Sequence, residues 1–246
     1  MYTRLRSFRR MMLITLPAIL LLAVPVFAQQ DYVTQFDAFA GYNFLNSAKL
    51  GLSEPGFGGQ FGFRPKTWYS FGFDYTASAG DMTIVPGLLP TALQQQLGAQ
   101  LGGLAAAGML PPGYKLMVPA HSNTQTFAVG PQLAYRHFKH VTLFLRPVFA
   151  GAIRETATPR PGDPIAAAVV AQLTPAGKKT DIAPFIGFGG GFDILFSHHF
   201  AIRAQADYVY DHLFNDILAD GRFTTRFAIG PAFNFGKNIV ETPNKP

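Results

Sequence analysis

The chain has 246 residues, among them 24 phenylalanines, one tryptophan and no cysteine. The lack of cysteine excludes disulfide bonds and thiol chemistry. Basic residues number 20 against 14 acidic ones, but four arginines fall in the first ten positions, and without them 16 basic residues face the 14 acidic ones. This near-equal number of basic and acidic residues gives no case for nucleic-acid binding.

Residues 1–28 have the pattern of a cleaved export signal. A basic start containing Arg4 and Arg10 precedes an apolar run from Met11 to Phe27, and Val26-Phe27-Ala28 ends it with small residues where a signal peptidase reads them. A membrane-anchoring helix is the alternative, but the run is short and contains two prolines. We expect cleavage after Ala28, a barrel domain over residues 29–236 and a short polar tail over 237–246.

Beyond the signal, apolar and polar residues alternate with a period of two, which is the side-chain period of a β-strand. The pattern predicts strands at 33–44, 56–64, 68–77, 122–136, 141–154 and 222–235. Residues 183–214 add a hairpin of two strands around the connection Ser197-His198-His199. Eight strands of this kind predict an all-β, antiparallel fold.

The two faces of these strands differ in chemistry. One face is aromatic and aliphatic, and includes Phe71, Phe149, Ile153 and Phe188. The other face carries charges that are all aspartate or arginine: Asp37, Asp74, Asp193, Asp207, Arg64, Arg136, Arg146, Arg203 and Arg226. In an exported chain this division predicts a transmembrane barrel with its aromatic face on lipid and its charges in the lumen. A soluble, lipocalin-like barrel with an aromatic interior is the rival fold.

The connections between the predicted strands alternate between short and long along the chain. Those after strands two, four and six are turns of three or four residues, whereas those after strands one, three, five and seven are longer, the first being Leu45 to Pro55. Short periplasmic turns and long extracellular loops are typical of outer-membrane barrels.

Two of the long loops contain helix signals. Leu93, Leu97, Leu101 and Leu104 form one stripe of a helix that begins after Pro90. Asp163 and Pro164 predict the N-cap and first residue of a second helix through Ile165, Val169 and Leu173. We expect the two helices to pack together as a lid, and a binding surface for a partner or lipid is the alternative.

Catalytic and metal sites are not predicted. His137, His140, His198 and His199 fall in the short turns, and His198-His199 makes a poor chelate because adjacent strand residues point apart. His121-Ser122, which would suit a lipid A deacylase, and Asp211-His212, which would suit an outer-membrane protease, lack convergent partners. We therefore expect no enzyme activity, no catalytic, cofactor-binding or metal residues, and no cofactor.

Several short motifs resemble one family. Gly191-Phe192-Asp193, Ile202-Arg203 and Asp207-Tyr208, with Gly41-Tyr42-Asn43-Phe44, are similar to the small OmpA-like eight-stranded barrels of the bacterial outer-membrane β-barrel domain family. Gly230, Phe233 and Phe235 resemble the C-terminal signal read by the barrel-assembly machinery. The resemblance implies the outer membrane of a diderm bacterium, with outer-membrane lipid and lipopolysaccharide as neighbours. The 11 residues from Gly236 to Pro246 are too few for the peptidoglycan-binding domain that OmpA carries.

Three functions remain open at this stage. The first is a structural or surface-interaction role, with the extracellular loops as a lid or as the binding surface for an extracellular partner. The second is a narrow, porin-like channel for small solutes or ions, which requires the inward charges to line a path rather than to plug the lumen. A lipid-modifying enzyme is the least favoured.

Overall fold

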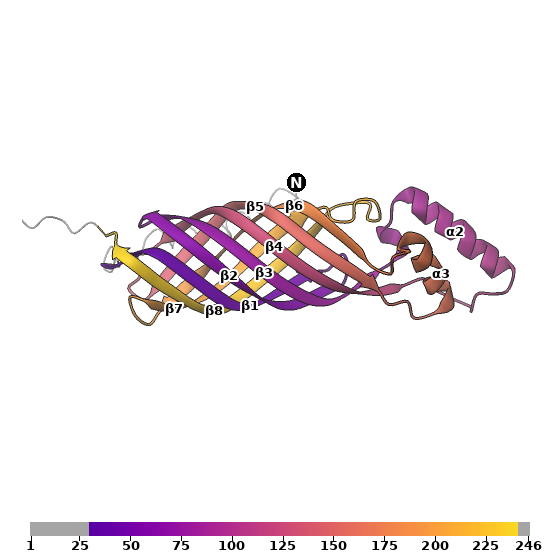
Figure 1. Ribbon diagram of the computed structural model, residues 1–246, viewed down its shortest axis with the longest axis horizontal. Helices are drawn as coiled ribbons and strands as arrows, with labels where there is room; N and C mark the ends of the chain where they lie inside the picture. The colour runs from indigo at the N-terminus through magenta and orange to yellow at the C-terminus, as the bar shows by residue number, and fades with distance from the viewer. Residues whose placement is uncertain (1–29, 241–246) are drawn as a thin grey trace, which may run out of the picture.

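The computed structural model describes residues 30–240, which form a closed barrel of eight antiparallel strands (Figure 1). Each strand pairs with its sequence neighbour, and β8 pairs with β1. The predicted signal peptide and the last six residues of the tail lie outside the described residues. The strands are β1 Thr34–Ser47, β2 Leu52–Lys66, β3 Tyr69–Ile84, β4 Val118–Tyr135, β5 Val141–Pro159, β6 Lys179–Leu195, β7 Phe200–Asp211 and β8 Arg222–Asn238.

The predicted fold class and strand faces are confirmed on most strands. The outward side chains are large and exposed, as for Phe57, Phe71, Phe188 and Phe227. The inward positions between them are buried, and they hold all the charges that the sequence placed in the lumen except Arg136, which lies just after β4. An exposed aromatic surface around a buried polar interior is the reverse of a soluble barrel. The lipocalin-like alternative is therefore excluded.

On β5 the predicted faces are wrong beyond Arg146. Arg146 pairs with Gly189 of β6, whereas Phe149 pairs with Gly187, so β5 has one extra residue and forms a bulge at this point. Pro147 lies within the bulge, where its missing N–H does not cost a ladder hydrogen bond. The extra residue reverses the alternation, so Phe149 and Ile153 face the lumen and are almost completely buried.

Several strands run further than expected at the end where the loops lie. β5 continues to Pro159, and β2 begins at Leu52 with Pro55 exposed on its outer face. The first connection is consequently only 48–51, and the prediction of a loop of about ten residues from Leu45 to Pro55 is wrong. Serine, proline and glycine at 53–56 are typical of loops, but here they form part of the ladder. We call this end of the barrel the loop end, and the opposite end, with connections 67–68, 136–140 and 196–199, the turn end.

The expected loop helices are present. The β3–β4 loop contains a 3₁₀ turn, η1 Pro86–Leu88, and the helix α2 Thr91–Ala106, and the β5–β6 loop contains α3 Pro164–Leu173. The Asp163 carboxylate caps α3 by accepting hydrogen bonds from the N–H groups of Ile165 and Ala166 at 2.9 and 2.8 Å. Both helices lie beyond the loop end of the barrel (Figure 1). Within residues 30–240, no helix is long and apolar enough to cross a membrane.

The bulge can be tested by comparing two phenylalanines. Phe149→Ala removes a buried ring from the lumen and should lower the free energy of unfolding by about 3–5 kcal/mol. Phe127→Ala, on the outer face of the neighbouring strand β4, should cost clearly less because half of that side chain is already exposed. Urea unfolding in detergent or liposomes measures both values. Equal costs would mean that Phe149 faces outward and that β5 has no bulge.

Candidate functional site

Four charged residues in the middle of the lumen form a closed ring of ion pairs, which we call the central quartet. Asp74 lies on β3, Arg146 on β5, Asp207 on β7 and Arg226 on β8. Arg146 contacts Asp74 at 2.5 Å and Asp207 at 3.0 Å, and Arg226 contacts the same two carboxylates at 3.2 and 2.7 Å. All four side chains are at most 4% exposed. Two positive and two negative charges therefore neutralise one another out of water, as buried ions must.

A second cluster lies nearer the turn end. Arg203 donates to the Asp193 carboxylate from Nε at 2.8 Å and from Nη2 at 3.0 Å. The same Nη2 lies 2.9 Å from the Asp37 carboxylate. Arg64 approaches Asp37 from β2 at 3.1 Å. This cluster is neutral as well, and its two-pronged arginine contact fixes both orientation and register.

Arg136 does not join either cluster, although the sequence placed it among the lumen charges. Its guanidinium donates to the carbonyl oxygen of Thr67 at 2.8 Å, to Thr142 at 3.0 Å and to the amide oxygen of Gln30 at 3.2 Å. Gln30 in turn donates to Thr142 and to the Phe138 carbonyl. Arg136 and Gln30 thus close the lumen at the turn end with neutral hydrogen-bonding partners.

Aromatic rings pack against these arginines. The Arg146 guanidinium carbon lies 4.0 Å from the centre of the Phe149 ring, and that of Arg226 lies 5.5 Å from the same ring. Arg203 lies 5.1 Å from the ring of Phe144. Desolvated cation–π contacts of this kind add to the ion pairs and occupy space that water would otherwise enter. The described lumen is therefore filled by its own side chains, as an eight-stranded barrel allows.

A third set of charges, nearer the loop end, was missed by the sequence reasoning. Arg222 contacts Asp211 at 3.0 Å and also contacts Glu155. Glu54 accepts hydrogen bonds from Ser78 and Thr124, both at 3.1 Å. Glu54 and Glu155 were placed in loops because the predicted strands ended too early. Continuing the period-two alternation of β2 before residue 56 would have found Glu54, whereas Glu155 faces inward only because the bulge at Pro147 reverses the alternation of β5.

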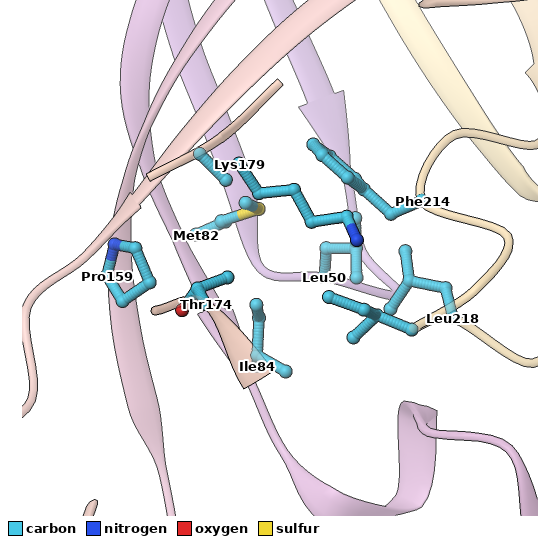
Figure 2. Close-up of a pocket in the computed structure, with 10 residues that line it drawn as sticks. Leu50, Met82, Ile84, Pro159, Thr174, Lys179, Phe214 and Leu218 are labelled. Atoms are coloured by element: carbon cyan, nitrogen blue, oxygen red, sulfur yellow. The ribbon is translucent and has the colours of Figure 1, made fainter. Parts of the chain in front are cut away.

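Apolar side chains close the loop end of the lumen. The β7–β8 connection, residues 212–221, which we call the stopper loop, buries Leu213, Phe214 and Leu218 against apolar residues of the barrel mouth. A small pocket remains beside them, and Figure 2 shows Met82 and Ile84 on one side of it and Phe214 and Leu218 on the other. Its lining residues are Leu50, Met82, Ile84, Ala157, Pro159, Thr174, Lys179, Phe214, Ile217 and Leu218.

The two loop helices contribute side chains to one buried apolar cluster. Leu97 of α2 and Ala166 and Val169 of α3 are buried in one cluster. Ile217 of the stopper loop contacts both this cluster and the core of the barrel mouth. Leu104, the last leucine of the predicted stripe, is outside the cluster. The expectation that the two helices form a lid stays a prediction.

The residues considered for catalysis do not converge. Ser122 is buried in the lumen, whereas the neighbouring His121 points outward and contacts Asp81 at 3.1 Å. Asp211 is engaged by Arg222, and His212 is exposed. His137, His140, His198 and His199 lie in or beside the turns, where His198 stacks on Tyr32. Among the described residues, no group of three or more histidine, aspartate or glutamate side chains could hold a metal ion.

The fold and its filled lumen define a small eight-stranded barrel of the outer-membrane type. No family model and no curated protein sequence matches the chain. Solved structures with a similar fold include Ail, the attachment invasion locus protein of Yersinia pestis, at 10% identity over 84% of this chain and 100% of that chain, with a TM-score of 0.44. OprG of Pseudomonas aeruginosa has the same identity and TM-score over 85% and 100% of the two chains. Neisserial surface protein A is 13% identical over 81% and 96%, with a TM-score of 0.42. These neighbours are small outer-membrane barrels of the kind that the sequence motifs resemble.

The central quartet yields a test of the lumen. Asp207→Asn leaves Arg146 and Arg226 with one carboxylate instead of two, and should lower the free energy of unfolding by about 3–5 kcal/mol. Asp216→Asn is the matched control, because Asp216 forms its ion pair with Lys179 on the exposed rim and should cost at most about 1 kcal/mol. Reversible folding into liposomes measures both. If Asp207→Asn is as mild as the control, the quartet is solvated and the lumen is wider than described.

Proposed function

We propose that this chain is an outer-membrane β-barrel protein with a structural or surface-interaction role. The observation that carries the proposal is the reversed polarity of the barrel, whose outer face is aromatic and exposed while its charges are paired inside. In a closed barrel the backbone N–H and C=O groups of every strand are hydrogen-bonded to its neighbours and no edge is left open. This is the condition for crossing a bilayer with strands. Outer-membrane lipid and lipopolysaccharide would contact this face.

The filled lumen favours a barrel that does not conduct. Ion pairs, aromatic rings and the stopper loop occupy it from the turn end to the loop end. The function would then reside at the surface, where α2 and α3 form a lid or a surface for an extracellular partner. During biogenesis, the barrel-assembly machinery would read Gly230, Phe233 and Phe235 on β8, where both phenylalanine rings face outward.

A narrow channel is the second candidate, and a specific observation favours it. Within the described lumen, several buried polar atoms have no protein partner, among them both amide atoms of Asn43, Glu155 Oε1 and an Arg222 nitrogen. Such groups bind water where there is room for it. Single-channel recording in planar bilayers separates the two candidates, because a structural barrel gives no conductance steps and a channel does. A lipid-modifying enzyme has no convergent residues to support it.

The membrane assignment predicts a penalty for charge on the outer face. Phe188→Arg should lower the free energy of folding into liposomes by about 2–4 kcal/mol if the residue lies near the bilayer midplane. Phe57→Arg, close to the loop end of β2, should cost less because the penalty falls toward the interface. Near-neutral values at both positions would contradict lipid contact and with it the proposed location.

The proposed lid predicts a dependence of α3 on α2. Leu97→Asp places a charge in the shared cluster and should speed proteolysis of residues 160–178 by elastase on intact cells several-fold, because Ala166 and Val169 lose their cover. Gln96→Asp, one residue away on the exposed face of α2, should leave the rate unchanged. Equal rates for the two variants would mean that α3 is protected by something other than α2.

A further inference from the structure

The stopper loop closes the barrel by a different chemistry from the rest of the lumen. Leu213 and Phe214 are 1% and 4% exposed and pack into an apolar cluster with Leu50, Leu52 and Met82 at the barrel mouth. Below them the lumen is held by paired charges, which are costly to separate. An apolar contact is non-directional, so another apolar group of similar size can replace either partner.

Phe214 occupies this mouth in a strained backbone conformation. Its φ is +54°, and among residues 30–240 it is the only non-glycine residue with a positive φ. A bulky residue rarely adopts the left-handed region without a surrounding structure that imposes it. Here the Phe214 N–H donates to the Asp181 carboxylate at 2.5 Å, and its carbonyl oxygen accepts from the N–H groups of Ile217 and Leu218 at 2.8 and 2.7 Å. These hydrogen bonds hold the Phe214 backbone in its strained conformation, which keeps the ring in the barrel mouth.

The ion pairs between the loop and the rim lie on the exposed side of the mouth. Lys179 contacts Asp216, and Lys49 contacts Asp220 at 3.4 Å, both with partly exposed side chains. Exposed pairs of this kind contribute little to stability. A single backbone hydrogen bond of 3.0 Å, from Ala219 N–H to the Leu88 carbonyl oxygen, joins the stopper loop to the β3–β4 loop. The positive φ of Phe214 opposes the burial of Leu213, Phe214 and Leu218, so this loop is the strained part of the apolar closure.

The pocket beside Phe214 shows what could replace its ring. The pocket is lined by apolar residues except for Thr174 and Lys179, and its free volume of about 30 Å³ holds no more than a water-sized group. A ligand must therefore displace a side chain, and the strained Phe214 ring is the one that leaves an aromatic-sized space. Lys179 reaches across the pocket toward Phe214 and Leu218 (Figure 2), but its amine is engaged by Asp216. No free charge remains to select an anion or a polar ligand.

We propose that the barrel mouth is a binding site for a small apolar molecule, a single aromatic ring or a short alkyl chain, which takes the place of the Phe214 ring when the stopper loop lifts. The inference goes beyond the structural role proposed above and does not depend on whether the lumen conducts.

A photoreactive apolar probe can test the site. The intact protein in lipid nanodiscs would be labelled with a phenyl diazirine, and labelled peptides would be identified by mass spectrometry. We expect labelling at Met82 and Ile84 that saturates with probe concentration and falls at least fivefold with excess toluene. Lipid-facing Phe71 and Phe127 provide the internal reference, where labelling should rise in proportion to the probe. Labelling of the mouth that is absent, or that does not saturate, overturns the proposal.

A disulfide can show that the loop must lift. The chain has no cysteine of its own, so Leu88→Cys with Ala219→Cys introduces one defined pair. These two residues are already joined by the backbone hydrogen bond between the stopper loop and the β3–β4 loop, which makes them the natural pair to cross-link. Oxidation should reduce labelling of the mouth at least fivefold, and reduction of the same sample should restore it, which also shows that the variant is folded. Equal labelling in the two redox states overturns the proposal.

Phe214→Ala tests whether the Phe214 ring occupies the place of the ligand or forms part of the pocket wall. Removing the competing ring should let the probe saturate the mouth at a several-fold lower concentration, because no side chain then has to be displaced. Phe227→Ala, on the lipid face of β8, is the matched control and should leave saturation unchanged. If Phe214→Ala weakens labelling at Met82, the ring is part of the binding surface rather than the group that the ligand replaces, and the proposal is wrong.

Discussion

The central quartet is the constraint on which the rest of the barrel depends. Asp74, Arg146, Asp207 and Arg226 come from β3, β5, β7 and β8, so their contacts form only when the whole circle of strands has closed in one register. A shift of one strand by one residue would move a charge to the lipid side and leave its partners unpaired. Each unpaired buried charge costs several kcal/mol, so the quartet selects one register among the alternatives.

Glycine makes room for these carboxylates. Gly189 lies opposite Asp207 on β6, and a Cβ built at this glycine would collide with the Asp207 carboxylate. Gly62 has the same relation to Asp37 in the cluster nearer the turn end. These two inward glycines therefore contribute by leaving the space that the Asp207 and Asp37 carboxylates occupy. Replacing them would force the ion pairs apart rather than merely stiffen the strands.

Much of this arrangement could be predicted from sequence because the period of a strand is strict. The aromatic face and eight of the nine lumen charges followed from alternation alone. Phe149 and Ile153 could not be placed in this way. One extra residue at the Pro147 bulge reverses the alternation of β5, and nothing in the sequence shows that a bulge occurs there. Glu155 is turned inward by the same bulge. Glu54 was missed for another reason, since the serine, proline and glycine beside it outweighed a continuing alternation. The stopper loop has no period at all, so only the structure shows that Phe214 enters the mouth.

The two ends of the barrel are closed by opposite chemistry, and this has a physical consequence. At the turn end, Arg136 and Gln30 close the lumen through directional hydrogen bonds to Thr67, Phe138 and Thr142. An apolar solute cannot replace such partners, because the groups it displaced would remain buried and unsatisfied. At the loop end the closure is apolar, and exchanging one apolar group for another leaves no polar atom without a partner. The bulge on β5 connects the charged centre with the apolar closure, because it turns Phe149 inward, where the ring belongs to the apolar cluster and lies directly against Arg146. A barrel built in this way can exchange its outer seal with apolar groups while its charged centre stays closed.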